Sequence, residues 1–167
     1  MMEMFSPEIT ERAGELLELC RGRGLRLATV ESCTGGLIAG CLTAHAGSSD
    51  VLERGYVTYS NEAKAEDAGV AAGLIESHGA VSEKVAAAMA QGALARNPVD
   101  VAVSVTGIAG PGGATPTKPV GLVYIAAAVK GGETTVERYI FPGDRTAVRN
   151  AAVFEALDLT VRAIQGS

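Results

Sequence analysis

Hydrophobic positions recur along the chain at helical and strand spacings in alternation. Between residues 9 and 20, apolar residues recur every three or four positions, which is typical of one face of a helix. Ser6 supplies a cap and Pro7 a favoured first residue for this helix. Gly22 and Gly24 are predicted to end it, because glycine is common just past a helix terminus.

The same reasoning predicts the remaining elements. Strands are expected at 25–30, 53–59, 100–105, 121–129 and 134–141, and helices at 37–46, 61–68, 74–78, 83–96 and from 145 to the C-terminus. The last helix is expected to bury a stripe formed by Ala147, Ala151, Phe154, Leu157, Val161 and Ile164. The Gly-Gly turn at 130–133 indicates a β-hairpin.

This order of elements predicts an α/β fold, a three-layer α/β/α sandwich with a mixed, mostly parallel sheet of about five strands. The strand at 100–105 is apolar on both faces, which is typical of the middle of a covered sheet. The sheet is expected to be parallel in its first part, with an antiparallel edge from the hairpin. A chain of 167 residues is expected to form a single domain, residues 1–167.

Composition narrows the class of protein. Hydrophobic residues make up 47% of the chain and charged residues 20%, which excludes a disordered chain. The formal net charge is −5, so no basic field is available for nucleic acid or an anionic membrane. We therefore expect neither nucleic acid nor a membrane as a partner. The Ala-rich helices lead us to expect a homo-oligomer.

Cysteine usage and the N-terminus indicate a reducing, cytoplasmic location. Cys20, Cys33 and Cys41 form an odd set without CxxC spacing, which argues against a disulfide framework or a zinc site. The N-terminus lacks the apolar core of a signal peptide. The longest apolar stretch, at 120–129, is about half of what a membrane span needs. No metal and no cofactor are expected.

The turn at 31–36 is the first candidate for chemistry. It follows a predicted strand and precedes a helix, where open α/β sheets bind ligands. Ser32 is a candidate nucleophile, and the backbone N–H groups of Cys33, Thr34, Gly35 and Gly36 are candidate donors to an oxyanion. The alternative is that Ser32 or Thr34 only caps the helix, while the glycines allow close packing.

A serine nucleophile needs a base, and the two histidines, His45 and His78, lie in ordinary helix-end settings. A lysine can serve if burial or a nearby cation lowers its pKa enough to make it neutral. Lys64 follows the second predicted strand by one helical turn, and Tyr59 stands at that strand's end. If the first two strands are parallel neighbours, Ser32, Tyr59 and Lys64 converge. The alternatives are a solvated lysine and a half-buried strand-end tyrosine.

Two further segments are candidates for ligand binding. The Gly/Pro loop at 106–119 follows a buried strand, and it is too long for a mere connection. It lacks the Gly-Lys-Ser/Thr of a P-loop, but its glycines let backbone N–H groups approach a phosphate or carbonyl, and it carries Lys118. Arg145 in the first turn of a helix suits a bound phosphate. The alternatives are a flexible edge loop and a solvated arginine beside an Asp144 cap.

Together these segments resemble the CinA C-terminal domain family, whose characterised enzymes are nicotinamide-nucleotide amidohydrolases (NMN deamidases). The matching stretches are ESCTGGLIA at 31–39, GSSDVLERGYVTYSNEAK at 47–64, HGAVSE at 78–83, SVTGIAGPGGATPTKPVGLVY at 104–124 and FPGDR at 141–145. They occur in the family's order over nearly the whole chain. Many relatives also carry a large N-terminal domain linked to nucleotide pyrophosphatase activity, which we do not expect here.

The resemblance implies a Ser/Lys amidohydrolase that converts nicotinamide mononucleotide and water to nicotinic acid mononucleotide and ammonia. Ser32 would be the nucleophile, Lys64 the general base and Tyr59 the assisting hydroxyl. The implied substrate-binding residues are Cys33, Thr34, Gly35, Thr106, Gly107, Ile108, Ala109 and Arg145.

The chain departs from the family at Ala65-Glu66-Asp67-Ala68, where relatives usually carry a larger apolar residue, and this could alter packing around Lys64 and hence its pKa. It also departs at Ala44-His45-Ala46, where relatives often have an acid followed by apolar residues. Three other readings stay open. The domain could be a non-catalytic nucleotide-binding or regulatory module with the same pocket. The substrate could be a different small amide. Cys33 could be the nucleophile, although no histidine neighbours it in the motif.

Overall fold

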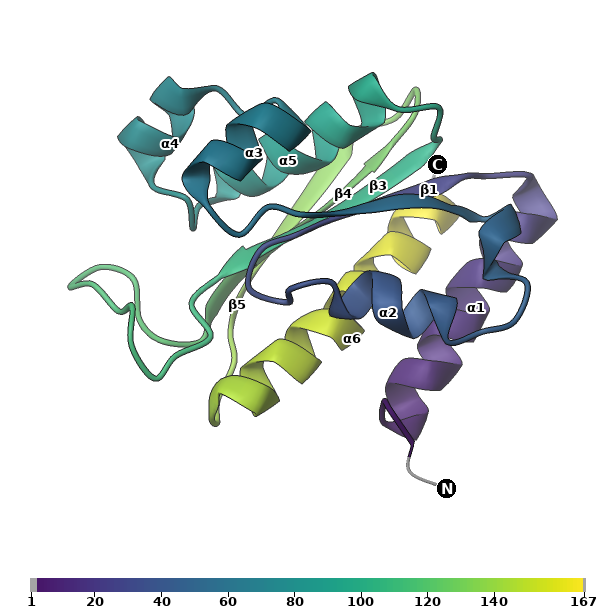
Figure 1. The fold of residues 1–167 in the computed structure, drawn as a ribbon, viewed down its shortest axis with the longest axis horizontal. Helices are drawn as coiled ribbons and strands as arrows, with labels where there is room; N and C mark the ends of the chain where they lie inside the picture. The colour runs from purple at the N-terminus through teal and green to yellow at the C-terminus, as the bar shows by residue number, and fades with distance from the viewer. Residues whose placement is uncertain (1–2, 167) are drawn as a thin grey trace.

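Five strands form one sheet in the order β2-β1-β3-β4-β5 in the computed structural model, which describes residues 3–166 (Figure 1). The strands are β1 (Leu27–Glu31), β2 (Leu52–Val57), β3 (Val101–Gly107), β4 (Leu122–Val129) and β5 (Thr134–Ile140). The helices are α1 (Pro7–Arg23), α2 (Leu37–Thr43), α3 (Asn61–Ala68), α4 (Ala72–His78), α5 (Glu83–Arg96) and α6 (Arg145–Gln165), with a 3-10 turn at Ser48–Asp50.

The sheet is mixed and mostly parallel, as predicted. β1 runs parallel to both β2 and β3, whereas β4 is antiparallel to β3 and β5 is antiparallel to β4. Only β4 therefore runs against the other strands. Glu31 pairs with Val57 on one side and Val105 on the other, so the carboxyl ends of three strands meet at one edge.

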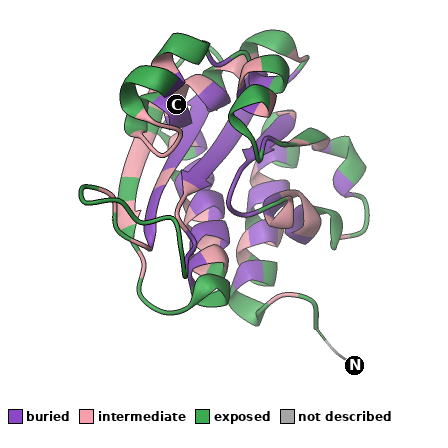
Figure 2. Cartoon of the chain, turned by 60° about the vertical axis from the view of Figure 1, so that its left-hand side comes forward, coloured by how far each residue is buried: buried purple, intermediate pink, exposed green. Residues whose placement is uncertain are grey.

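Helices cover both faces of the sheet, which confirms the three-layer arrangement (Figure 1). α1, α2 and α6 pack on one face and α3, α4 and α5 on the other, and Figure 2 shows the buried strands between them. Successive side chains of β3 point to opposite faces of the sheet. Val103 packs in the hydrophobic core beneath α1, α2 and α6, whereas Ala102 packs in the core beneath α3, α4 and α5. On the α5 side, Ala126 of β4 packs with Ala90 of α5, and such small residues let the helix approach closely.

Several boundaries differ from the sequence predictions. α1 continues through Gly22 and ends at Gly24, whose φ of 66° places it in the left-handed region. The helix predicted at 37–46 stops at Thr43. β3 continues through Thr106 and Gly107, because both pair with β4, so the predicted loop begins two residues later.

The buried face of α6 is also rotated from the predicted stripe. Leu157, Val161 and Ile164 are buried, but Ala147 is exposed and the neighbouring Val148 is fully buried instead. The physical reason is that α6 packs against both the sheet and α1, which widens and shifts its apolar face. No helix within residues 3–166 combines the length and the apolar character that crossing a bilayer requires.

Candidate active site

Ser32 and Lys64 meet at the carboxyl edge of the sheet. Lys64 Nζ lies 2.9 Å from Ser32 Oγ and donates to the Thr58 carbonyl at 2.8 Å. Ser32 directly follows β1, and its N–H donates to the Val105 carbonyl of β3 at 2.9 Å. Lys64 lies in α3, whose first turn is capped by the hydroxyl of Ser60. Parallel pairing of β1 and β2 thus brings the two side chains together, as predicted.

Burial lowers the pKa of this lysine. Lys64 is 1% exposed, and within the described chain it has no carboxylate partner. Desolvation therefore lowers the pKa of Lys64, because a charged ammonium is poorly solvated in this environment. The departure from the family at 65–68 leaves the lysine buried. A neutral amine beside a serine hydroxyl is the arrangement that general-base activation needs.

A cavity of about 230 Å³ opens onto this pair. Its lining consists of Ser32, Cys33, Tyr59, Asn61, Lys64, Ala80, Val81, Thr106, Gly107, Ala109 and Arg145. Most of the predicted site residues therefore line one cavity. Thr34, Gly35 and Ile108 are not among the lining residues, whereas Asn61, Ala80 and Val81 were not predicted. Ala80 and Val81 lie before α5 in the family-matching stretch HGAVSE, which is the signal that could have found them, although their apolar side chains indicate no chemistry.

Glu31 ties the turn after β1 to α2. Its buried carboxylate accepts hydrogen bonds from the backbone N–H groups of Ile38 at 2.8 Å and Ala39 at 3.1 Å. Burial raises the pKa of Glu31, and these two donors oppose the rise. Glu31 therefore accepts from two N–H groups in the first turn of α2, which have no partner within the helix. Sequence reasoning placed Glu31 in the turn without giving it a role, although an acid just before a helix is a recognisable signal.

Only part of the predicted oxyanion hole is free to bind a ligand. The Gly35 N–H donates to the Ser32 carbonyl at 3.0 Å and closes the turn. The N–H groups of Cys33 and Thr34 donate to no backbone carbonyl in residues 3–166. The Gly36 N–H interacts with the Glu31 carboxylate, and Thr34 is fully buried and does not line the cavity. The Cys33 N–H, the first after the nucleophile, is therefore the remaining candidate donor.

Tyr59 and Arg145 lie together at the rim of the cavity. Tyr59 is 61% exposed, and its hydroxyl accepts a hydrogen bond from Arg145 Nη2 at 2.9 Å. Arg145 Nη1 donates to the Gly110 carbonyl at 2.9 Å, which joins the rim to the loop after β3. Tyr59 thus shares the cavity with Ser32 and Lys64, while its hydrogen bond goes to Arg145.

The start of the Gly/Pro loop is held by hydrogen bonds within the protein. The Thr106 hydroxyl donates to the Ala80 carbonyl at 2.8 Å, and the Ile108 N–H donates to the Leu122 carbonyl at 2.8 Å. A Cβ on Gly107 would lie 2.6 Å from a methyl carbon of Val123, so close packing requires glycine there. Beyond this anchored part, residues 111–117 are exposed and extend away from the sheet (Figure 1).

The Cys33 thiol is not suited to act as a nucleophile. Burial raises the pKa of Cys33 to about 11, so the thiol is protonated near neutral pH. Cys20, Cys33 and Cys41 are all free and buried. Within the described residues, no group of three or more His, Cys, Asp or Glu side chains is arranged to hold a metal ion.

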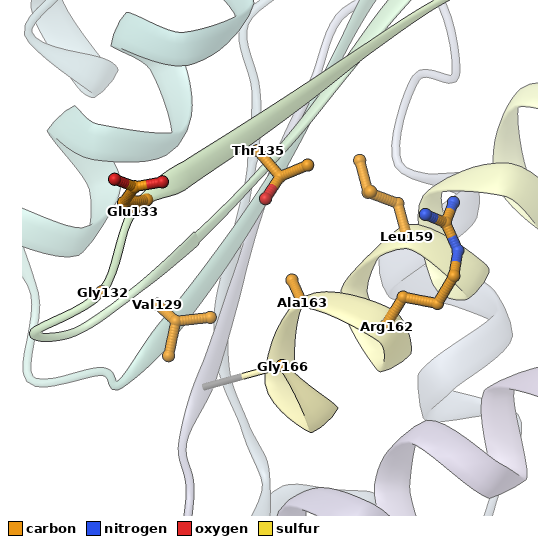
Figure 3. A pocket seen from close by; sticks show the side chains of 8 residues that line it. All are labelled: Val129, Gly132, Glu133, Thr135, Leu159, Arg162, Ala163 and Gly166. Carbon is orange, nitrogen blue, oxygen red and sulfur yellow. The ribbon is translucent and has the colours of Figure 1, made fainter.

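A larger hollow of about 420 Å³ lies at the opposite end of the sheet, beside the β4–β5 turn (Figure 3). Glu133 and Arg162 are among the side chains around it. Arg162 is already bound by Glu137 at 2.7 Å and Asp158 at 2.8 Å. Its charge is therefore satisfied, and this hollow lacks the Ser/Lys chemistry of the smaller cavity.

Comparison with known proteins gives consistent results. The family model described as "CinA C-terminal domain" matches residues 9–164. The chain is 49% identical over 150 residues to the nicotinamide-nucleotide amidohydrolase PncC of Escherichia coli, covering 90% of this chain and 89% of that protein. It is 50% identical over 164 residues to a CinA-like protein of Mycolicibacterium vanbaalenii, covering 98% of this chain.

The chain spans only 38% of that CinA-like protein. Among solved structures, the competence/damage inducible protein CihA from Agrobacterium tumefaciens superposes with a TM-score of 0.94 at 44% identity. That match covers 97% of this chain and 99% of the other.

Proposed function

This chain belongs to the CinA C-terminal domain family, and from that premise we propose that it is an amidase acting on nicotinamide mononucleotide. The products would be nicotinic acid mononucleotide and ammonia. The observation that carries the proposal is the 2.9 Å contact between Ser32 Oγ and the buried Nζ of Lys64. The similarity to the PncC amidohydrolase supports the choice of substrate.

The first half of the proposed reaction forms an acyl-enzyme. Neutral Lys64 takes the hydroxyl proton of Ser32 while Oγ attacks the carboxamide carbon. The N–H group of Cys33 donates to the oxyanion that develops. The tetrahedral intermediate then collapses, the C–N bond breaks, and the Lys64 ammonium gives its proton to the departing ammonia.

The second half releases the acid. A water molecule gives a proton to neutral Lys64 and attacks the ester carbonyl between Ser32 and the nicotinoyl group. The second tetrahedral intermediate breaks its bond to Oγ, and the Lys64 ammonium returns a proton to Ser32. Nicotinic acid mononucleotide leaves, and both side chains regain their starting states.

Local charge at the cavity suits a phosphate-bearing substrate, although the whole chain is acidic. Three cationic side chains donate hydrogen bonds to carbonyl or hydroxyl oxygens within the described chain: Arg145, Arg149 and Lys118. In contrast, five other arginines pair with carboxylates: Arg12, Arg21, Arg26, Arg54 and Arg162. We propose that Arg145, at the cavity rim, binds the substrate phosphate, because a charged acceptor makes a stronger hydrogen bond than a neutral one.

Tyr59 is proposed to assist at the same rim. Its hydroxyl accepts from Arg145, so its own proton remains available for a second hydrogen bond. We propose that the hydroxyl orients the substrate carboxamide beside Ser32 and supports proton transfer there.

Ammonia release from nicotinamide mononucleotide, without added metal, tests the proposal. We expect release by the wild type, loss of release by Ser32→Ala, and wild-type rates from Ser49→Ala, which changes an exposed serine. Calorimetric binding of the nucleotide without ammonia release would contradict the proposal and favour a non-catalytic binding module. Release by Ser32→Ala at the wild-type rate would exclude Ser32 as the nucleophile.

A further inference from the structure

Arg149 contacts the backbone that directly follows the nucleophile. It lies one turn beyond Arg145 in α6 and is half-buried. Its Nε donates to the Cys33 carbonyl at 3.0 Å, and its Nη2 donates to the Thr34 carbonyl at 3.2 Å. A single guanidinium thus binds two successive carbonyls of the turn between β1 and α2.

Gly35 shapes the turn that Arg149 binds. Its φ of +59° lies in the left-handed region that favours glycine, while an added Cβ would be in ordinary contact with Arg149 Nη2 at 3.4 Å. The glycine is therefore required by the backbone conformation of the turn.

The covalent geometry of the peptide bond links these carbonyls to the candidate oxyanion donor. The C=O of one residue and the N–H of the next belong to one planar trans peptide, so they point in opposite directions. Arg149 holds the Thr34 carbonyl, and the Gly35 N–H at the other end of that peptide donates to the Ser32 carbonyl at 3.0 Å. The Ser32 carbonyl shares its peptide with the Cys33 N–H, so this chain of contacts fixes the direction of the N–H of a residue that lines the cavity.

We propose that Arg149 is a positioning residue that holds the turn after Ser32 so that the Cys33 N–H serves as an oxyanion donor. The inference rests on the proposed amidase function. Arg149 is not among the residues that line the cavity, which separates its role from that of Arg145 as a phosphate ligand. Its positive charge also polarises the chain of hydrogen-bonded peptides, which strengthens the Cys33 N–H as a donor.

Kinetics of Arg149→Gln test this role. Without the guanidinium, the peptides of the turn after Ser32 can rotate and the oxyanion donor is misplaced. Loss of one oxyanion donor lowers kcat by about 10²–10³-fold. We expect nucleotide affinity, measured by calorimetry in a Ser32→Ala background, to change less than about threefold, since Arg149 lies outside the cavity lining. The midpoint of the pH–rate profile should stay in place, because Lys64 remains the base.

Two related variants separate positioning from general damage. Arg149→Lys keeps the charge but cannot span both carbonyls, so kcat should remain well below that of the wild type. Arg149→Ala should regain part of its kcat in guanidinium chloride at concentrations that leave the fold intact by circular dichroism. Arg23→Gln is the matched control, because Arg23 also donates to a backbone carbonyl, that of Ile164 at 2.7 Å, and packs on the far end of α6.

Labelling of Ser32 by a fluorophosphonate keeps the test independent of the substrate. Oγ forms a bond to phosphorus, fluoride leaves, and Lys64 takes the proton, while charge develops on the phosphoryl oxygen that the same N–H donor would bind. We expect mass spectrometry to show labelling at Ser32 that is at least about tenfold slower in Arg149→Gln than in Arg23→Gln.

The outcomes distinguish this inference from the proposed function. A kcat for Arg149→Gln within about fivefold of wild type, or a loss of affinity at unchanged kcat, would overturn the positioning role. If the wild type released no ammonia from the nucleotide, the proposed function would fail, and the labelling rates alone would decide on Arg149. Equal labelling rates, or no labelling of wild-type Ser32, would overturn the inference.

Discussion

Lys64 has an environment that lysine rarely occupies, because its amine is buried with a hydroxyl and a carbonyl as partners and, among residues 3–166, no carboxylate. The pKa of Lys64 is lowered by this burial, so the neutral form becomes available below the ordinary lysine range. We expect the rate of amide hydrolysis to rise with pH to a midpoint below about 10.4. Lys64→Arg should lose at least about 10²-fold in kcat, since a guanidinium does not deprotonate. Steady-state rates across pH provide the measurement, and an active Lys64→Arg variant would rule out the base role.

The same lysine predicts a pH dependence of stability. Between its folded pKa and about 10.4, the unfolded chain binds the proton of Lys64 while the folded chain does not. The free energy of unfolding should therefore rise with pH in this range, and Lys64→Met should lack that part of the rise. Urea titrations of both proteins at successive pH values up to about 10.4 measure the difference. Parallel curves would show that Lys64 titrates alike in the folded and unfolded chains.

Tyr59 differs from Lys64 because its hydroxyl lies at the exposed rim. Its partner is Arg145 rather than Ser32, so Tyr59→Phe removes a hydrogen bond without removing the nucleophile or the base. We expect about a tenfold to hundredfold loss of kcat/KM, smaller than the loss in Ser32→Ala. The comparison uses initial rates of ammonia release by the two variants. A loss in Tyr59→Phe equal to that in Ser32→Ala would place Tyr59 in the proton transfer itself.

At the scale of elements, the contact between α3 and α5 holds Lys64 in place. A Cβ on Gly92 would lie 1.6 Å from the Ala68 carbonyl oxygen, at the end of α3. Gly92→Ala should therefore displace α3, cost about 1–3 kcal/mol or more of stability, and lower activity. Gly73→Ala is the control, since no atom lies within 4 Å of its added Cβ, and it should be neutral or stabilising by about 0.4–1 kcal/mol. Thermal unfolding of both variants checks the prediction. Equal stabilities of the two variants would show that α3 can shift away from α5 at little cost in stability.

The elements themselves were largely predictable from the sequence, and their exact contacts were not. The capping residues Ser6, Ser82 and Asp144 act where local chemistry predicts, because each side chain accepts from a backbone N–H of its own first turn. The shift of the α6 stripe from Ala147 to Val148 depends on two packing partners at once, which no helical period encodes. The binding of Arg149 to the turn after Ser32 joins residues more than a hundred positions apart, so spacing along the chain gives no signal for it.

At the scale of the molecule, the order of the strands assembles the site. Ser32, Lys64 and the start of the loop after β3 come from three sequence regions, and parallel pairing of β1 with β2 and β3 places them at one edge. That convergence could be predicted once the strands were taken as parallel neighbours. The single domain over residues 1–167, the homo-oligomer, the cytoplasmic location and the lack of nucleic-acid binding stay predictions. Sedimentation equilibrium would test the oligomeric state directly.

The distribution of charge over the molecule leads to a last prediction. The chain carries a net charge of −5, yet Arg145 at the cavity rim hydrogen-bonds only neutral acceptors. A substrate phosphate would therefore be attracted locally by an uncompensated cation, and such attraction at an exposed site is screened by salt. We expect KM for nicotinamide mononucleotide to rise with sodium chloride while kcat changes little, and Arg145→Gln to raise KM by about tenfold or more and flatten its salt dependence. Arg54→Gln, which removes an exposed arginine paired with Glu53, should keep the wild-type dependence. A KM that depends on salt equally in Arg145→Gln and wild type would assign the phosphate to another cation at this edge, and Lys118→Gln would then be the next variant to measure.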